Sequence, residues 1–386
     1  MLSALSPYNK SRCKKRKVIV YDTTLRDGEQ MPGIAFTKEQ KLEIAHALAD
    51  AGIKEIEAGY PAVSEEERAA IKEIKATTNA RILGLSRCKP EDIEACAECN
   101  IDLVLLFIAT SPLHRHWKLK MEKEEIVRKV EESIEFAKTL GLNVCFSTED
   151  TTRTELDFLH EVYGVAVSLG VERIGITDTL GCGAPEAISF LVRELKARYS
   201  VPISLHLHND FGLACANAIA GLDAGADAFA VTVMGIGERA GNLALEQFVM
   251  AAKFLRGVET GIEPARLQKV AEIVSRHARH QIPKNQPWIG ENIFSHASGI
   301  HAAAVLENPF TYEPVAPSVL GRERRILLGK HSGRGVLRAK LLSFGIEISD
   351  KELESILREV KSVGTREGYV SDQQLLEIVE RVRKGR

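Results

Sequence analysis

A repeated alternation between two kinds of segment constrains the fold of this chain more than any other feature. From Lys17 to about residue 256, short runs rich in β-branched residues alternate with longer amphipathic runs. This rhythm is typical of repeated βα units with a parallel sheet. Strands are predicted at residues 18–21, 55–58, 81–85, 103–108, 143–146, 173–177, 203–207 and 228–231. Helices are predicted between them, among others at residues 38–50, 65–75, 124–140, 155–169, 185–199, 214–224 and 245–255.

Eight such units fit into one domain. A span of roughly 240 residues matches the size of a single TIM (β/α)8 barrel, so we predict an α/β fold with the barrel at residues 17–256. A doubly wound open sheet is the alternative. Beyond residue 256, helical patterns at 263–279, 335–344, 350–363 and 371–384 flank an irregular Gly- and His-rich segment at 289–333. We expect a helical connector at 257–288 and a smaller, mostly helical C-terminal region at 289–386.

The composition excludes several classes of partner. Of 386 residues, 51 are Lys or Arg and 53 are Asp or Glu, so no overall basic field concentrates nucleic acid or anionic lipid. No apolar run reaches membrane-spanning length, and residues 1–17 lack the apolar core of a secretory signal. Seven scattered cysteines suit a reducing compartment better than a disulfide framework. We expect a cytoplasmic protein whose partners are small molecules.

Polar residues at the carboxyl ends of the predicted strands are the candidates for chemistry, because the active sites of such barrels lie there. The first strand runs directly into the polar segment DTTLRDGEQ at residues 22–30. Burying this many polar groups is costly unless they bond to one another, to a metal or to a ligand. A charged helix cap is the alternative.

The seventh strand ends in a His-x-His pattern that indicates a metal site. Side chains alternate across a strand, so His206 and His208 point to the same side and can meet one ion, whereas a single histidine would more often be structural. The glycine-rich loop after the last strand carries Asn242. Because barrel closure places the eighth strand between the seventh and the first, Asp27 can converge with these three residues. Imidazoles combined with oxygen ligands suit Mn, Mg, Zn or Co.

Two further strand ends add polar groups. Ser147 and Glu149 follow the fifth strand, and Thr179 follows the sixth. Asp150 and Asp178 beside them have an equally good explanation as N-caps of the following helices. Glu149 and Thr179 are therefore the stronger candidates.

Five motifs in a fixed order identify the chain as similar to a known family. They are DTTLRDGEQ at 22–30, HLHNDFG at 206–212, GIGERAGN at 235–242, SHASGIH at 295–301 and LGKHSG at 328–333. Through these motifs, and over nearly its whole length, the sequence resembles the 2-isopropylmalate, homocitrate and citramalate synthases of the DRE-TIM metallolyase superfamily. The resemblance implies an acyltransferase that condenses acetyl-CoA with a 2-oxo acid by a metal-assisted Claisen condensation, followed by hydrolysis of the thioester.

The resemblance also implies roles for individual residues. Four of them would bind or approach the divalent metal: Asp27, His206, His208 and Asn242. Arg26 would hold the 2-oxo group, Glu149 would assist in the acid–base network, and Thr179 would bind the substrate carboxylate.

Two residues of the appended region complete the implied site. His301 and Tyr312 are similar to family residues that reach the active site from the partner subunit, which implies a homodimer. Because an imidazole exchanges protons near neutral pH, His301 is the candidate base for the acetyl-CoA methyl group.

Three observations bear on which 2-oxo acid is used. The chain ends after the helical region, so we expect no C-terminal regulatory domain of the leucine-responsive type. Lysine-pathway homocitrate synthases resemble one another in an arginine two residues before the serine of the strand-five motif, and Cys145 stands there in this chain. Residues 6–9 and 107–114 resemble the methanogen homocitrate synthases. We therefore favour 2-oxoglutarate, giving homocitrate, with 2-oxoisovalerate and then pyruvate or oxaloacetate as alternatives.

A distal carboxylate in the substrate needs hydrogen-bond donors, since burying it unpaired is prohibitive. We expect Ser147 and the cluster His114, Arg115 and His116 to supply them. A solvated loop is the alternative interpretation of that cluster.

Other classes of function fit the sequence less well. Carbon–carbon lyases of the same superfamily carry a catalytic cysteine in the loop after the eighth strand, and residues 235–242 contain none. A biotin-dependent carboxytransferase would need partner domains. A structural, metal-holding barrel would leave the polar groups at five strand ends unexplained.

Overall fold

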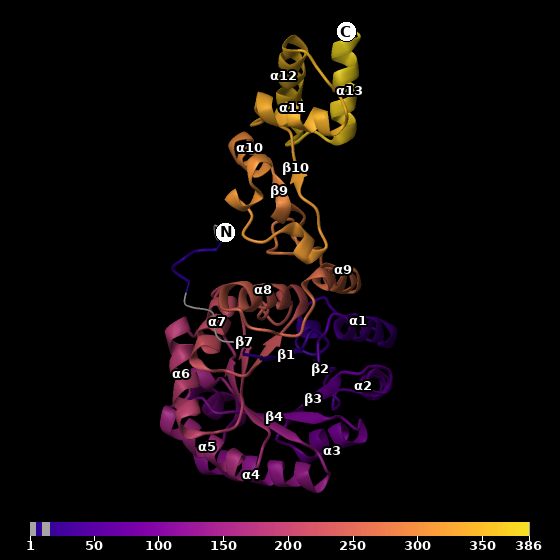
Figure 1. Cartoon of the computed structure of the whole chain (residues 1–386). Coiled ribbons are helices and arrows are strands. Elements are labelled where there is room, and N and C mark those ends of the chain that lie inside the picture. Colours follow the sequence, from indigo (N-terminus) through magenta and orange to yellow (C-terminus); the bar gives the residue numbers. More distant parts are fainter. Residues whose placement is uncertain (1–4, 10–15, 386) are drawn as a thin grey trace. The chain divides into compact units, whose positions relative to one another are not determined.

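The alternating segments of the sequence form a closed barrel (Figure 1). The computed structural model describes residues 5–9 and 16–385. Within these ranges eight parallel strands pair in sequence order, and the last strand returns to the first. The strands are β1 (Ile19–Asp22), β2 (Glu55–Glu57), β3 (Arg81–Arg87), β4 (Leu103–Ala109), β5 (Val144–Glu149), β6 (Arg173–Asp178), β7 (Ile203–Leu207) and β8 (Ala228–Val231). The predicted TIM barrel is confirmed.

Helices follow the strands and cover the outside of the barrel. They are α1 (Lys38–Asp50), α2 (Glu65–Thr77), α3 (Pro90–Glu98), α4 (Lys123–Thr139), α5 (Leu156–Ser168), α6 (Pro185–Arg198), α7 (Ala214–Ala224) and α8 (Leu245–Ala251). Local sequence determines where several begin: Thr37 and Gln40 form a capping box for α1, and Pro185 begins α6. A short π-helical segment (Ala252–Arg256) continues α8 and ends at Gly257.

The two faces of the barrel wall have different characters. Alternate strand residues pack outward on the helices, as Phe146 does on Tyr163 of α5 and Phe229 on Phe248 of α8. The inward positions form a small apolar cluster of Tyr21, Leu83, Leu103, Leu105, Cys145, Ala228 and Ala230. Nearer the carboxyl ends the inward positions are polar, so the polarity of the barrel's interior increases toward that end.

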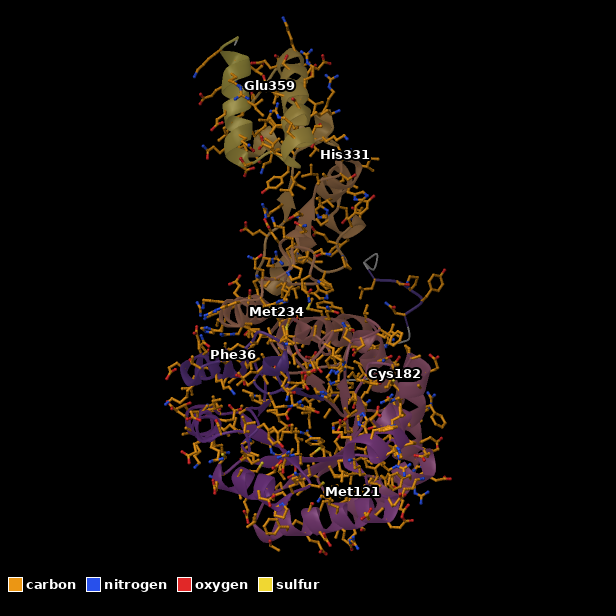
Figure 2. All side chains as sticks on the ribbon, turned by 180° about the vertical axis from the view of Figure 1, so that it is seen from behind. Phe36, Met121, Cys182, Met234, His331 and Glu359 are labelled. Carbon is orange, nitrogen blue, oxygen red and sulfur yellow. The ribbon has the colours of Figure 1, made fainter. Side chains whose placement is uncertain are left out.

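The described chain divides into two units. One comprises residues 16–282, and the other comprises residues 5–9 and 283–385. Helix α9 (Leu267–Ala278) belongs to the barrel unit, where Arg276 and His277 both contact Glu43 of α1. Figure 2 shows the side chains of both units, with Met121 in the barrel unit and His331 in the second.

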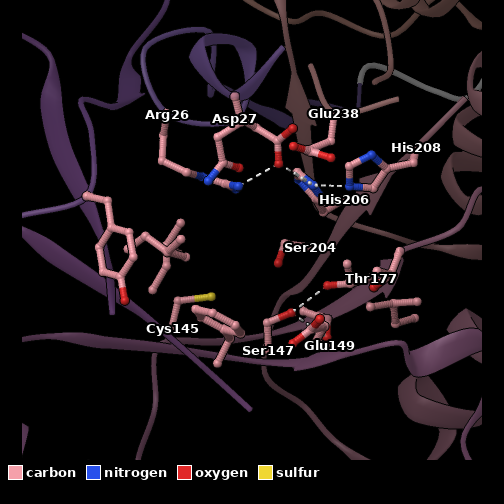
Figure 3. Close-up of a pocket in the computed structure, with 18 of the residues that line it drawn as sticks. Arg26, Asp27, Cys145, Ser147, Glu149, Thr177, Ser204, His206, His208 and Glu238 are labelled. Atoms are coloured by element: carbon pink, nitrogen blue, oxygen red, sulfur yellow. Dashed lines mark hydrogen bonds and ion pairs between the residues drawn. The ribbon is translucent and has the colours of Figure 1, made fainter. Parts of the chain in front are cut away.

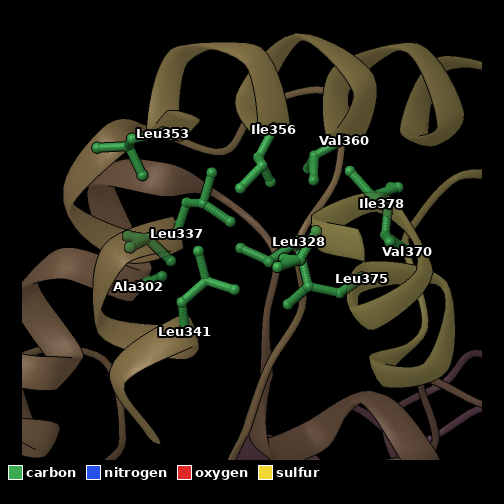
Figure 4. Packing of buried hydrophobic residues seen from close by; sticks show 12 residues of the cluster. Ala302, Leu328, Leu337, Leu341, Leu353, Ile356, Val360, Val370, Leu375 and Ile378 are labelled. Carbon is green, nitrogen blue, oxygen red and sulfur yellow. The ribbon is translucent and has the colours of Figure 1, made fainter. Parts of the chain in front are cut away.

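The second unit is small and mostly helical, as predicted. It contains α10 (Gly299–Glu307), α11 (Arg334–Ser343), α12 (Asp350–Glu367), α13 (Asp372–Arg383) and a two-stranded sheet of β9 (Ser295–His296) and β10 (Arg325–Ile326). Its core includes Leu328, Leu337, Leu341, Leu353, Ile356, Val360, Leu375 and Ile378 (Figure 4). The expectation of an irregular segment at 289–333 is wrong for residues 299–307, which form α10.

The length and polarity of the helices bear on whether any of them could cross a membrane. Even the 18-residue α12 carries charged side chains along its length. Within the described ranges, no helix combines the length and the apolar character needed to cross a bilayer. The expectation that residues 1–17 hold no secretory signal falls largely on residues outside those ranges.

Candidate functional site

A cavity of about 360 Å³ opens at the carboxyl ends of the barrel strands (Figure 3). Seven residues singled out from the sequence line it: Arg26, Asp27, Ser147, Glu149, Thr179, His206 and His208. Asn242 lies buried against Asp27. His301 and Tyr312 belong to the second unit.

Arg26 is held by two carboxylates. Its Nε and one terminal nitrogen donate to the two oxygens of Glu57 at 2.9 and 3.1 Å, and its other terminal nitrogen lies 2.5 Å from Asp27 Oδ2. Thr23 donates a further hydrogen bond to Glu57, which is fully buried at the end of β2. A buried guanidinium needs such partners, because removing an unpaired charge from water is strongly destabilising.

Sequence reasoning missed Glu57. The signal was the pair of acidic residues Glu55 and Glu57 at alternate positions of a short buried strand. Acidic groups on the inner face of a barrel strand require a cationic partner. Arg26 supplies that partner for Glu57.

Asp27, His206 and His208 converge into a group that could hold a metal ion. One ligand atom from each lies within 4.8 Å of the others. His206 Nε2 lies 3.2 Å from His208 Nε2 and 3.4 Å from Asp27 Oδ2. The alternation along β7 and the closure of the barrel therefore bring these side chains together as the sequence predicted.

The electrostatics of this group favour binding of a cation. Burial would raise the pKa of Asp27, but Arg26, His206 and His208 outweigh it and hold this pKa well below its usual value. Burial, together with the neighbouring His206, lowers the pKa of His208 to about 3. The carboxylate is thus charged and the His208 imidazole is neutral at physiological pH, which are the forms that bind metals.

The loop after β8 closes over these three residues. Asn242 Nδ2 donates to Asp27 Oδ1 at 2.7 Å, while Asn242 Oδ1 is buried without a partner in the described part of the chain. Gly237 has a φ of 150°, and a Cβ there would lie 2.1 Å from Asn242 Nδ2. Only glycine permits this approach. A buried carbonyl oxygen left without a donor is a group that a bound cation would satisfy.

Arg239 joins two of the motifs. Its guanidinium donates to both oxygens of Asp210 at 2.8 and 3.0 Å and to the carbonyl of Thr179 at 2.6 Å. Arg239 and Glu238 line the cavity, although the sequence did not single them out. The GIGERAGN loop is therefore fixed against both β6 and β7.

The ends of β5 and β6 form a polar wall. Glu149 accepts two hydrogen bonds from Lys118 Nζ, at 2.6 and 2.8 Å. Ser147 Oγ lies 2.9 Å from Thr177 Oγ1 and donates to the carbonyl of Gly175. Thr179 Oγ1 accepts the backbone N–H of Asp150, so its own hydrogen is free to donate.

The expectation that the cluster His114, Arg115 and His116 contributes donors to this cavity is wrong, because none of the three lines it. Arg115 donates to the carbonyl of Thr110 and to Glu155, and its guanidinium lies over the ring of Phe158. His116 is exposed, and neither residue lines the cavity. The chain here forms one π-helical segment (His114–Leu119), a conformation that periodicity does not reveal, and this segment directs Lys118 toward the site instead.

His301 and Tyr312 lie next to each other in the second unit. Their rings are stacked, with centroids 4.0 Å apart and planes inclined by 28°. Glu313, which follows Tyr312, accepts hydrogen bonds from Arg324 and lies 3.0 Å from His296 Nε2. His301 and Tyr312, which are 11 positions apart in the sequence, thus form one exposed pair. The contacts of Glu313 hold the chain beside this pair in place.

Comparison with known proteins agrees with the fold and the motifs. Residues 17–274 match the HMGL-like family model, and residues 288–368 match a model described as homocitrate synthase post-HMGL domain-like. The chain is 46% identical over 382 residues to a homocitrate synthase (AksA) of Methanothermobacter thermautotrophicus, covering 98% of both chains. The chain belongs to the homocitrate synthase and 2-isopropylmalate synthase family. The family resemblance inferred from the five motifs is confirmed.

Members with other names are nearly as similar. A 2-isopropylmalate synthase of Methanocaldococcus jannaschii is 45% identical over 95% of this chain and 72% of its own length. An (R)-citramalate synthase of the same organism is 43% identical over 95% of this chain and 74% of its own length. Among solved structures, an HMG-CoA lyase of Bacillus subtilis has a TM-score of 0.64 at 19% identity and covers 71% of this chain and 97% of its own. This last similarity shows the family's barrel fold.

Proposed function

We propose that the chain is a homocitrate synthase, an acyltransferase that condenses acetyl-CoA with 2-oxoglutarate. The observation that carries the proposal is the similarity to a homocitrate synthase over 98% of both chains. The cavity supports the chemistry, because Arg26 and the group of Asp27, His206 and His208 meet in it.

The four residues Asp27, His206, His208 and Asn242 fit a divalent cation such as Mn, Mg, Zn or Co. Two imidazole nitrogens with carboxylate and amide oxygens form a mixed donor set that suits these ions better than Ca. The unpartnered Asn242 Oδ1 supports the fit, because it lies beside a carboxylate and lacks a donor within the described chain. The ion, when bound, would draw electron density from the ketone of the 2-oxo acid.

Arg26 would bind and orient the 2-oxo acid. Glu57 and Asp27 occupy part of its guanidinium, and the remaining N–H groups are left for an oxygen in the cavity. As the ketone oxygen gains negative charge during the reaction, this fixed positive charge stabilises it. Thr179 and Ser147, on the polar wall, would donate to carboxylate oxygens of the substrate.

His301 would remove a proton from the methyl group of acetyl-CoA, with Tyr312 beside it and Glu149 in the acid–base network. The resulting enolate carbon attacks the ketone carbon and forms the new C–C bond, while the C=O π bond opens to an alkoxide that takes up a proton and becomes the product's hydroxyl group. Water then cleaves the thioester, releasing CoA as its thiol and leaving a carboxylic acid. We propose that His301 and Tyr312 serve the barrel of the partner subunit in a homodimer.

A 2-isopropylmalate synthase is the second candidate. Leu85, Leu105, Phe107 and Ile176 also line the cavity, and an apolar wall suits the branched chain of 2-oxoisovalerate. Relatives with this name and with the name citramalate synthase have similar identities.

The deciding experiment is CoA release measured with acetyl-CoA and a panel of 2-oxoglutarate, 2-oxoisovalerate, pyruvate and oxaloacetate. The highest kcat/KM is expected for 2-oxoglutarate. EDTA should abolish turnover, and His208→Ala should weaken metal binding measured by calorimetry by about 10- to 100-fold or more. A higher kcat/KM for 2-oxoisovalerate would replace the homocitrate assignment by the second candidate, and full activity of metal-free protein would contradict the metal site.

A further inference from the structure

The inner end of the cavity contains polar groups that the proposed chemistry does not use. Cys145 on β5 and Ser204 on β7 line this end, and Figure 3 shows both below the metal-binding group. Gly175 lies between them on β6, and a Cβ there would come within 2.6 Å of Ser147 Oγ and 3.1 Å of Ser204 Oγ. The missing side chain therefore keeps a passage open into the barrel.

Arg173 lies one layer deeper, at the inward position that precedes Gly175 on the same strand. It is the register partner of Cys145 and is 3% exposed. One terminal nitrogen donates to Glu55 Oε2 at 2.7 Å, and the guanidinium lies 5.0 Å from the centre of the Tyr21 ring. Burial raises the pKa of the Cys145 thiol despite the opposing charge of Arg173 beside it, so this thiol stays neutral.

The guanidinium of Arg173 is only partly satisfied. Its Nε is buried without a hydrogen-bond partner among the described residues. Its carboxylate partner is shared, because Glu55 also faces Arg81 at 3.5 Å. A buried N–H group without an acceptor is destabilising. The unpaired Nε–H of Arg173 is therefore a candidate to bind an anionic ligand, which would supply the missing acceptor.

The cationic groups nearer the mouth are already paired. Lys118 donates to Glu149, and Arg239 donates to Asp210. The negative charge of these carboxylates opposes binding of a second anion there. The Nε–H group of Arg173 has no acceptor among the described residues, and its neighbours Tyr21, Leu105 and Cys145 are buried, which strengthens a charged hydrogen bond.

The dimensions fit a 2-oxo diacid. Inward side chains on one strand are spaced by about 6.6 Å along the barrel, and the two carboxyl carbons of an extended 2-oxoglutarate are about 5 Å apart. With its keto acid end at Arg26 and the two histidines, such a substrate places its second carboxylate at the level of Ser204, two positions before His206 on β7. The Arg173 side chain can meet it there from the layer below.

We propose that Arg173, acting with Ser204 at the inner end of the cavity, selects 2-oxo acids that carry a distal carboxylate. The inference rests on the proposed condensation and adds the residue that determines the substrate class. It locates the recognition group on β6, beneath the reacting atoms, and not in the segment that contains Arg115.

The test compares 2-oxoglutarate with pyruvate, which lacks the distal carboxylate. Arg173→Met is combined with Glu55→Gln so that no unpaired carboxylate stays buried. For this double variant we expect kcat/KM for 2-oxoglutarate to fall about 100-fold, with the value for pyruvate changing less than about 3-fold. Calorimetry without acetyl-CoA should show the same selective loss of 2-oxoglutarate binding. Arg81→Met is the matched control, since it removes an arginine from the same ion cluster without facing the cavity.

A second pair of variants tests the proposal independently, in case the double variant does not fold. Cys145→Asp places a negative charge in front of Arg173 and should weaken 2-oxoglutarate selectively, while Cys145→Asn gives the same size without the charge. Equal losses for both substrates, or an unchanged ratio in both variant series, would overturn the role of Arg173. A wild-type enzyme that prefers 2-oxoisovalerate or pyruvate would instead overturn the proposed homocitrate synthase, which keeps the two failures distinguishable.

Discussion

The site depends on single residues that hold charged neighbours in place. Arg26 is anchored by Glu57 and Asp27, and Asn242 is anchored by Asp27. Glu57, Asp27 and Asn242 are buried and Arg26 is nearly so, and a charged group among them would be destabilising without its partner. These residues therefore form a connected network in which a small displacement at one of them is transmitted to the carboxylate of Asp27.

A substitution at Gly237 tests whether Asn242 and Asp27 are coupled in this way. Gly237→Ala would place a Cβ 2.1 Å from Asn242 Nδ2 and 2.9 Å from Asp27 Oδ1, so both side chains must move. We expect metal affinity measured by calorimetry to fall by about 10-fold or more, and kcat to fall with it. Gly261→Ala is the control, because Gly261 also has positive φ but has nothing within 4 Å of the added methyl group. Unchanged metal affinity in Gly237→Ala would contradict this account of the loop.

Asp22 gives a prediction for pH. Burial raises its pKa to about 7 against the hydrogen bonds from Thr24, and Glu57 acts in the same direction as burial. The folded protein keeps this proton while the unfolded chain loses it near pH 4, so stability from this group is present below about pH 4 and is lost as pH rises to 7. Asp22→Asn cannot ionise. We expect the free energy of unfolding of Asp22→Asn, relative to wild type, to increase by about 2 kcal/mol between pH 5 and pH 7.5 in urea titrations. A constant difference across that range would show that Asp22 ionises normally.

The sequence predicted those site residues whose chemistry depends on spacing along one strand. His206 and His208 are two positions apart, and the alternation of a strand places them together. Glu57 and Lys118 were missed because their partners, Arg26 and Glu149, come from neighbouring strand ends; the alternating acidic residues of β2 indicated a buried charge at Glu57 but not its partner. Arg115 was a wrong expectation for the same reason: its partner Glu155 lies in the next loop along the barrel and not in the cavity.

At the scale of elements, strand and helix boundaries followed from the alternation of apolar and polar residues. Strands β7 and β8 have the predicted bounds. Strand β5 extends to Glu149, three residues beyond its predicted end, because Ser147 and Glu149 still pair with Phe107 and Ala109 of β4. Polar side chains inside a barrel mouth resemble a loop in the sequence although their backbone is still in the sheet. Helix α10 was missed because its residues, GIHAAAVLE, begin with glycine and lack an amphipathic stripe.

Helix α1 is fixed to the barrel loops by one buried lysine. Lys41 lies 2.7 Å from Glu29 and 2.5 Å from Glu67, and these carboxylates also accept the backbone N–H groups of Phe36 and Tyr60. Burial raises the pKa of Glu67 even though Lys41 opposes the shift. The positive charge of Lys41 thus offsets the repulsion between the carboxylates of Glu29 and Glu67. These ion pairs join α1, α2 and the loop after β1.

Lys41→Met should destabilise the barrel unit by about 2–4 kcal/mol, because it leaves two partly buried carboxylates without their counterion. Lys38→Met on the same helix removes an exposed pair with Glu73 and should change stability by less than about 1 kcal/mol. Urea unfolding followed by circular dichroism measures both. Equal effects of the two variants would mean that burial of the Lys41 pair contributes nothing.

The whole molecule consists of two units with separate hydrophobic cores, and the candidate residues are divided between them. The barrel unit contains the cavity, the proposed metal ligands and Arg26, whereas the second unit presents the stacked pair of His301 and Tyr312. The sequence predicted both the barrel and the helical region, since each has its own periodicity. It could not predict the second unit's internal contacts, such as the close approach of Gly364 to the backbone of Gly329 and Lys330, because these join segments about 35 residues apart.

This division of residues allows a test of the proposed homodimer. If each active site combines one chain's barrel with the partner's His301, mixing Arg26→Ala subunits with His301→Ala subunits creates heterodimers with one intact site and one doubly altered site. With random exchange, about a quarter of wild-type activity should return. Arg26→Ala mixed with Glu149→Ala is the matched control: both changes lie in the barrel unit, so every site retains one defect and no activity should return. Exchange is verified by native mass spectrometry of differently tagged chains. Failure of the first mixture to regain activity after verified exchange, or equal recovery in the control, would mean that sites are not shared between subunits in this way.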